Sequence, residues 1–206
     1  MLLYQLILTP ACQIRFQAMM TPLQKYQLDL ERPDFQFDAA QQNAVQHLQR
    51  LYNDFCQKVP QPQSWWQKLL GKKSSQPPLQ GLYFWGGVGR GKTYLVDTFF
   101  DCLPTERKLR VHFHRFMHKV HEELTALSGH SDPLELVADH FKQQTDIICF
   151  DEFFVSDITD AMILGTLMQA LFARGITLVA TSNIEPDGLY KNGLQRARFL
   201  PAIALI

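Results

Sequence analysis

Apolar residues recur at three- and four-residue spacing near the N-terminus. The run extends from Ala44 to Phe55, and the positions between its apolar members are rich in glutamine. This spacing predicts an amphipathic helix, and Asp38, shortly before the run, is a suitable N-cap. We therefore expect an N-terminal helix that precedes the main body of the fold.

After Gly81, short apolar strands alternate with helical segments. Strands are predicted at residues 82–85, 108–114, 146–150 and 176–180. Helices are predicted at residues 93–102, from the end of the second strand to residue 127, after Pro133, and at 158–172. Strands that alternate with helices pair in parallel through right-handed crossovers. The pattern predicts an α/β fold, a three-layer sandwich with a mostly parallel sheet.

Changes in composition divide the chain into three parts. We interpret residues 1–20 as a disordered or misassigned start, because their apolar run lacks the basic residues that begin a signal peptide. Residues 21–80 are expected to hold the N-terminal helix and a linker rich in proline, glutamine, lysine and serine. Residues 81–206 form the expected core. Because residues 199–206 are largely apolar and make a poor solvated terminus, we expect that a C-terminal lid is missing.

One segment of the linker has an apolar character of its own. Residues 64–71 are predicted to form a short helix with two tryptophans and two leucines. Such a helix could make a peripheral membrane contact or bind a partner. The alternative, which we prefer, is that Trp65 and Trp66 fold back onto the domain.

Charge and cysteine content narrow the class of protein. The chain has 20 lysines and arginines against 20 aspartates and glutamates, so no net field favours nucleic acid or anionic lipid. The four cysteines are scattered and form no C-x-x-C pair, which is typical of reduced thiols in a cytoplasmic protein. With no run of eighteen apolar residues, we expect no membrane-spanning helix.

The strongest chemical signal is a G-x-x-x-x-G-K-T motif between a predicted strand and a predicted helix. Its glycines allow main-chain N–H groups to surround phosphates, and the helix N-terminus adds a favourable dipole. Lys92 is expected to contact the β- and γ-phosphates, and Thr93 to bind Mg²⁺. The predicted ATP-binding residues are Gly86, Gly87, Val88, Gly89, Arg90, Gly91, Lys92 and Thr93. The alternative, a flexible glycine loop, fits poorly with the flanking strand and helix.

Two further groups of polar residues follow apolar strands. Asp151 is expected to hold Mg²⁺ opposite Thr93, and Glu152 to orient the attacking water, which favours hydrolysis over transfer to a bound hydroxyl. Glu152 taken alone could also be a solvated strand-end carboxylate. Asn183 ends the next strand and is predicted to sense the γ-phosphate, although the Thr-Ser-Asn sequence read alone is a turn.

Four histidines lie between residues 112 and 121. We place His112 and His114 on one strand face, and His118 and His121 one helical turn apart. Their spacing matches no recognised metal site, so we favour packing or a role in a substrate channel.

Several longer strings resemble the ZapE cell-division ATPases and their mitochondrial AFG-like relatives. They lie at residues 81–93, 111–117, 150–162, 178–183 and 189–203, and the resemblance covers residue 21 to the end. It implies an AAA+ fold, ATP hydrolysis with magnesium, and action as a homo-oligomeric ring or partial ring. It implies that Arg196 is an arginine finger, with Arg198 as second choice, and that Gln41 lies near the adenine. Helix-surface charge is the plainer interpretation of both arginines.

The resemblance also implies a protein client. In bacteria the family is implied to destabilise polymers of FtsZ at the division site, and the mitochondrial relatives to act in turnover of respiratory-complex subunits. Two other functions stay open. One is a helicase-loader-like or transposition-helper AAA+ protein bound to nucleic acid, against which the zero net charge argues. The other is a nucleotide-gated scaffold without significant turnover.

Overall fold

The computed structural model describes residues 20–57 and 79–206. The predictions for residues 1–19 and for segment 64–71 lie outside this part of the chain. No helix in the described part is long and apolar enough to cross a membrane.

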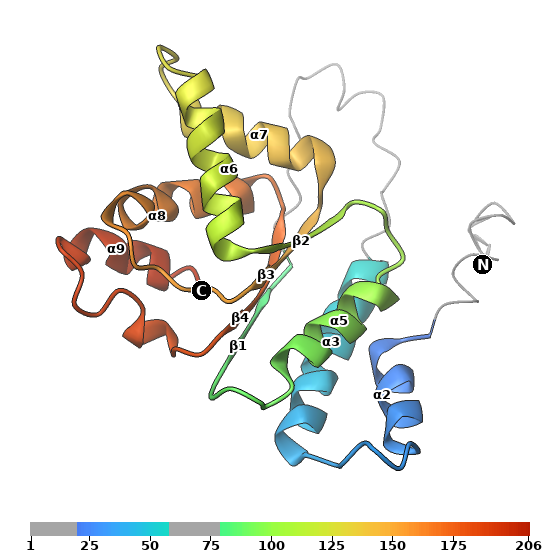
Figure 1. Cartoon of the computed structure of the whole chain (residues 1–206). Helices are drawn as coiled ribbons and strands as arrows, with labels where there is room; N and C mark the ends of the chain where they lie inside the picture. The colour runs from blue at the N-terminus through green and yellow to red at the C-terminus, as the bar shows by residue number, and fades with distance from the viewer. Residues whose placement is uncertain (1–19, 58–78) are drawn as a thin grey trace, which may run out of the picture.

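A parallel sheet forms the centre of the fold (Figure 1). Its strands pair in the order β1-β4-β3-β2, and every pairing is parallel. The strands are β1 (Leu82–Trp85), β2 (Lys108–His112), β3 (Ile147–Asp151) and β4 (Thr177–Ser182). Since β4 lies between β1 and β3, the segments that follow these three strands are neighbours at one edge of the sheet.

Helices cover both faces of the sheet. On one face lie α2 (Pro22–Leu30), α3 (Ala39–Gln57) and α5 (Lys92–Cys102). On the other face lie α6 (Phe113–Ala126), α7 (Pro133–Gln144), α8 (Ile158–Ala173) and α9 (Arg196–Ile203). A short 3₁₀ helix, η1 (Pro186–Gly188), precedes α9. The predicted three-layer α/β sandwich is confirmed.

Alternation along β3 shows why its sequence is continuously apolar. Ile147 and Cys149 belong to the core formed with α2, α3 and α5, whereas Ile148 and Phe150 belong to the core formed with α6 to α9. Successive side chains of a strand point to opposite faces. A central strand covered on both faces therefore needs apolar residues at every position.

The main error of the sequence interpretation concerns the end of β2. The strand stops at His112 and α6 begins at Phe113, so His112 and His114 do not share a strand face. Phe113, Phe116 and other apolar residues of α6 recur at helical spacing and are buried, and this packing outweighs the strand-like local alternation. Helix α2 was not predicted, although Thr21 and Gln24 form a capping box at its start.

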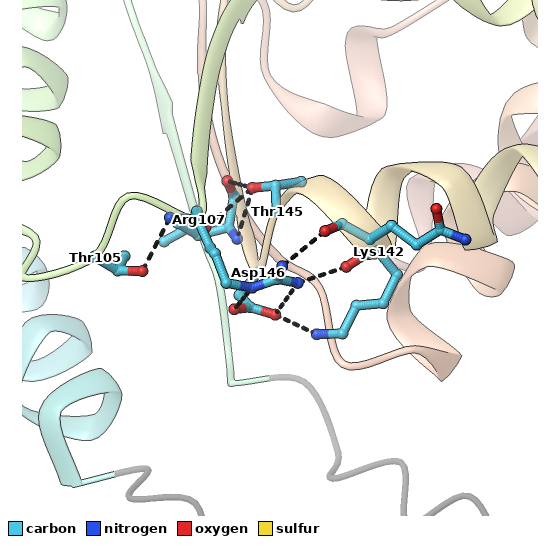
Figure 2. A network of polar contacts seen from close by, with 7 residues as sticks. Thr105, Arg107, Lys142, Thr145 and Asp146 are labelled. Carbon is cyan, nitrogen blue, oxygen red and sulfur yellow. Dashed lines mark hydrogen bonds and ion pairs between the residues drawn. The ribbon is translucent and has the colours of Figure 1, made fainter.

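A polar network fixes the sheet edge where β2 and β3 begin (Figure 2). The Arg107 guanidinium donates to both carboxylate oxygens of Asp146, at 2.7 and 3.3 Å. It also donates to the main-chain oxygens of Lys142 and Gln143, at 2.6 and 2.7 Å, near the end of α7. The ammonium of Lys142 donates to Asp146 Oδ1 at 2.5 Å. Arg107 thus satisfies helix carbonyls that have no partner within α7 and joins them to the start of β3.

This network predicts a contribution of Asp146 to acid stability. Partial burial raises the pKa of Asp146, but hydrogen bonds from Arg107 and Lys142 outweigh it and hold the pKa below its usual value. A carboxyl with a lowered folded-state pKa stabilises the fold above its unfolded pKa, near 4, and this stability is lost as pH falls through the folded pKa. Asp146→Asn should lower the unfolding free energy at neutral pH, because it removes the charge that Arg107 and Lys142 contact. The loss should be only about 1 kcal/mol, because solvent screens these partly exposed pairs.

Denaturant unfolding at several pH values measures this effect. The loss in Asp146→Asn should shrink below pH 4, where the wild-type carboxyl also becomes protonated. Asp54→Asn, at an exposed position on α3, is the matched control and should change stability little at any pH. A loss in Asp146→Asn that stays constant down to the lowest pH would contradict the electrostatic account.

Candidate functional site

Three polar segments meet where the parallel strands end. The P-loop (residues 86–91) follows β1, Asp151 ends β3 and Glu152 follows it, and Asn183 directly follows β4. Because β4 separates β1 from β3, Asn183 lies between the P-loop and the acidic pair. Ligands of open parallel sheets bind beyond the carboxyl ends of the strands. The structure thus brings together these site residues predicted from separate motifs.

The glycines of the P-loop give it a conformation that other residues adopt only with strain. Gly86, Gly89 and Gly91 have φ values of 144°, 81° and 75°. A Cβ at Gly86 or Gly89 would meet nothing within 4 Å, so these positions need glycine for its backbone freedom. Gly91 is the N-cap of α5, and within the described chain no side chain caps this helix. The first N–H groups of α5 remain suited to an anion.

Lys92 joins the P-loop to Asn183, the residue that follows β4. Its ammonium donates to the main-chain oxygens of Gly86 and Gly87 at 2.7 and 2.8 Å, and to Asn183 Oδ1 at 2.9 Å. These bonds use all three N–H donors of the lysine. The predicted phosphate-binding lysine and the predicted phosphate sensor are therefore in direct contact.

The start of α3 supports the P-loop from outside. Asp38 Oδ1 accepts hydrogen bonds from the main-chain nitrogens of Ala40 and Gln41 at 2.7 and 3.3 Å, which confirms the predicted N-cap. Gln41 Nε2 donates to the Arg90 oxygen at 3.2 Å, and a Cβ at Gly91 would approach the same nitrogen to 2.5 Å. Gln41 Oε1 is buried without a hydrogen-bond partner among the described residues. Gln41 lies beside the P-loop, and its contact with adenine stays a prediction.

Asp151 is held by an arginine that the sequence interpretation missed. Arg110 of β2 donates to Asp151 Oδ2 at 2.8 Å and to Oδ1 at 3.2 Å, and it also contacts Asp97 Oδ1 of α5. A signal for this pair existed. Arg110 is a charged residue between the apolar Leu109 and Val111 in the middle of β2, and Asp97 follows Thr93 by one helical turn.

Glu152 has an unusual backbone. Its φ of 54° lies in the left-handed region, which costs a residue with a side chain about 1–2 kcal/mol. Thr181 of β4 holds this turn, since its hydroxyl accepts from Glu152 N at 3.3 Å and its carbonyl accepts from Phe153 N at 2.7 Å. The Glu152 side chain is 77% exposed, and its Oε2 lies 3.7 Å from His112 Nδ1. The carboxylate of Glu152 is therefore open to solvent.

The donor set fits a magnesium ion bound with a nucleotide. Thr93 is exposed at the start of α5 and offers a hydroxyl oxygen. Each carboxylate oxygen of Asp151 accepts one hydrogen bond from Arg110 and retains a further lone pair. Hard oxygen donors of this kind are those that Mg²⁺ prefers. The four histidines form no such set, because the described residues contain no metal-ligand cluster.

The two arginines predicted as finger candidates lie apart from the P-loop. Arg196 begins α9, and its Nη2 donates to the Asp187 oxygen at 2.7 Å. Arg198 Nη1 donates to Gln195 Oε1 at 3.1 Å. Within the described chain, no hydrogen bond or ion pair joins either arginine to the P-loop. A role for them at this molecule's own phosphates therefore has no support.

Comparison with known proteins agrees with this geometry. Cell division protein ZapE of Escherichia coli (strain K12) is 58% identical over 194 residues, which cover 90% of this chain and 52% of that protein. Lactation elevated protein 1 homolog B of Danio rerio is 46% identical over 147 residues, which cover 66% of this chain and 29% of that protein. The crystal structure of DnaI has a TM-score of 0.53 at 16% identity, over 97% of this chain and 92% of that one, which supports the fold alone.

The chain spans about half the length of the ZapE protein that it matches. A family model described as AFG1-like ATPase matches residues 20–206. This range contains the P-loop, the acidic pair and Asn183, and the predicted P-loop fold of AAA+ type is confirmed. The chain belongs to the AFG1-like ATPase family.

Proposed function

We propose that this protein binds ATP with magnesium at the carboxyl edge of its sheet and hydrolyses it. The observation that carries the proposal is the hydrogen bond between Lys92 and Asn183, beside the strand that ends at Asp151 and is followed by Glu152. A P-loop lysine, a magnesium ligand and a base for water are the parts that phosphoryl transfer to water requires. The family assignment supports the same activity.

Each residue has a defined task in this proposal. The P-loop amides and Lys92 bind the phosphates, and Thr93 and Asp151 would hold the magnesium ion, which neutralises charge on the phosphates. Glu152 accepts a hydrogen bond from the attacking water and orients it. Asn183 would contact the phosphate that Lys92 binds, which its hydrogen bond to Lys92 at 2.9 Å supports.

Arg196 is proposed to act on a neighbouring subunit. It lies on α9, and its hydrogen bond goes to Asp187 of the same molecule instead of the P-loop. An arginine supplied in trans accelerates related reactions about a thousandfold or more. This role requires that the whole protein forms a homo-oligomer, in which the Arg196 of one subunit faces the ATP of the next.

We further propose that hydrolysis remodels a protein client and that FtsZ at the bacterial division site is this client. The support is the 58% identity to a protein named for cell division. No feature of the site favours the nucleic-acid-binding alternative, and the chain carries no net charge.

Two assays on the whole protein test these proposals separately. Phosphate release from ATP should require Mg²⁺ and stop when EDTA is added. Sedimentation of FtsZ polymers should show less pelleted FtsZ with the protein and ATP than with the protein and a non-hydrolysable ATP analogue. ATP binding without phosphate release, with FtsZ present or absent, would favour the nucleotide-gated scaffold. Normal turnover without any change in FtsZ sedimentation would remove FtsZ as the client.

A further inference from the structure

Arg110 occupies a position between the two elements that carry the proposed magnesium ligands. On β2 it pairs in register with Cys149, which is on the same strand face of β3 as Asp151. Cys149 packs in the core that contains α5. The Arg110 side chain therefore lies on the α5 side of the sheet, where one guanidinium contacts Asp151 of β3 and Asp97 of α5.

The two carboxylates differ in their surroundings. The side chain of Asp151 is 13% exposed and that of Asp97 is 49% exposed, while Arg110 is 21% exposed. A carboxylate as shielded as Asp151 is costly without a compensating charge. The Arg110 guanidinium supplies this charge and donates two hydrogen bonds to Asp151, from Nε and Nη2. Its third nitrogen, Nη1, contacts Asp97.

Removal of the guanidinium charge would change what this place can bind. Asp97 and Asp151 would then present two carboxylates around one partly shielded space, with no cation between them. Carboxylate oxygens in such an arrangement attract divalent cations. With Arg110 present, the guanidinium occupies this space and its charge repels a metal cation there, while each oxygen of Asp151 retains a lone pair that Arg110 does not use.

We propose that Arg110 is a positioning residue that makes divalent-cation binding depend on the nucleotide. It offsets part of the negative charge of Asp97 and Asp151 and occupies the space between them, so that these carboxylates alone hold no cation, and it orients Asp151 toward Thr93 for a cation that arrives with phosphate oxygens. This inference rests on the proposed ATP-binding function. As a consequence, Mg²⁺ does not occupy the space between Asp97 and Asp151 before ATP is bound.

The test measures Mn²⁺ binding to nucleotide-free protein by the loss of the electron paramagnetic resonance signal of free Mn²⁺. Arg110→Gln keeps a hydrogen-bond donor but removes the charge, and it should bind Mn²⁺ at least about tenfold more tightly than wild type. Arg110→Lys keeps the charge and should show no gain. Arg115→Met removes an arginine from an exposed position of α6 and should behave like wild type.

A double variant assigns the gain to these two carboxylates. Arg110→Gln combined with Asp97→Asn should lose the Mn²⁺ binding gained by the single variant. Circular dichroism establishes that each variant is folded. The proposal is overturned if folded Arg110→Gln binds Mn²⁺ no better than wild type, or if the double variant retains the gain.

Two measurements on the wild type keep the proposal testable whatever the variants do. With ADP present, the protein should remove more of the free Mn²⁺ signal than the same ADP does alone, whereas equally tight binding of Mn²⁺ without ADP would overturn the proposal. Fluorescent ADP binding, measured both in EDTA and with Mg²⁺, tests the P-loop separately. If the wild type binds no nucleotide, the proposed ATPase function fails, whereas the nucleotide-free comparison of Arg110→Gln with Arg110→Lys still decides the charge effect.

Discussion

Glu152→Gln should retain ATP binding and slow ATP hydrolysis by at least about a hundredfold. The amide keeps the size and polarity of the carboxylate but is too weak a base to orient and polarise the attacking water. Binding should persist, because the exposed Glu152 side chain (77%) has its carboxylate 3.7 Å from His112. The proposed phosphate-binding Lys92 instead contacts the P-loop, so the substitution leaves that contact unchanged. Calorimetry measures the affinity for ATP, and phosphate release measures the turnover.

Glu106→Gln provides the matched control for the loss of one carboxylate. Glu106 is exposed shortly before β2, at the edge of the sheet opposite the site, and its substitution should leave both binding and turnover unchanged. If Glu152→Gln hydrolyses ATP at the wild-type rate, Glu152 is only a solvated carboxylate at the end of a strand.

Mixed subunits extend this experiment to the proposed arginine finger. Arg196→Ala should lower turnover in the assembled protein. In a mixture with Glu152→Gln subunits, some sites combine an intact Glu152 with a neighbour's intact Arg196. The mixture should therefore recover part of the activity that each variant lacks alone. No recovery in a mixture shown to co-assemble would exclude a role of Arg196 between subunits.

Lys92→Ala should weaken ATP binding by at least about a hundredfold. The lysine has three donors on one ammonium, and it is placed between the P-loop carbonyls and Asn183. Charge-assisted hydrogen bonds to phosphate contribute about 1.5–3 kcal/mol each, so the loss of two suffices for this change. Calorimetry with ATP and Mg²⁺ measures it directly.

Lys191→Ala separates the specific contact from the general loss of positive charge. Lys191 is exposed between η1 and α9, and its removal should leave the affinity for ATP nearly unchanged. Thermal unfolding should show that Lys92→Ala is folded, because Lys92 lies at the helix start and outside both hydrophobic cores. Near-native affinity in folded Lys92→Ala would remove the P-loop argument.

Local patterns in the sequence were sufficient to predict most of the helices and strands. The G-x-x-x-x-G-K-T motif is eight consecutive residues, 86–93, and the order of its residues alone identifies it in the sequence. The helix at 158–172 and the apolar run at 147–150 likewise follow from periodicity and continuous burial, and α8 and β3 lie where they were expected. The boundary at His112 was missed, because the burial of Phe113 and Phe116 against other elements decided it.

The sequence by itself therefore determined which segments are the candidates for chemistry, since each motif depends on residues close in the chain. Only the tertiary structure decided how they meet: the order β1-β4-β3-β2 places Asn183 against Lys92, 91 positions away. It also decided that Arg110 pairs with Asp151, 41 positions away, and with Asp97 of α5. The strand order and the helix that covers each face fix such pairs. These follow from the burial of the whole chain, which no short pattern contains.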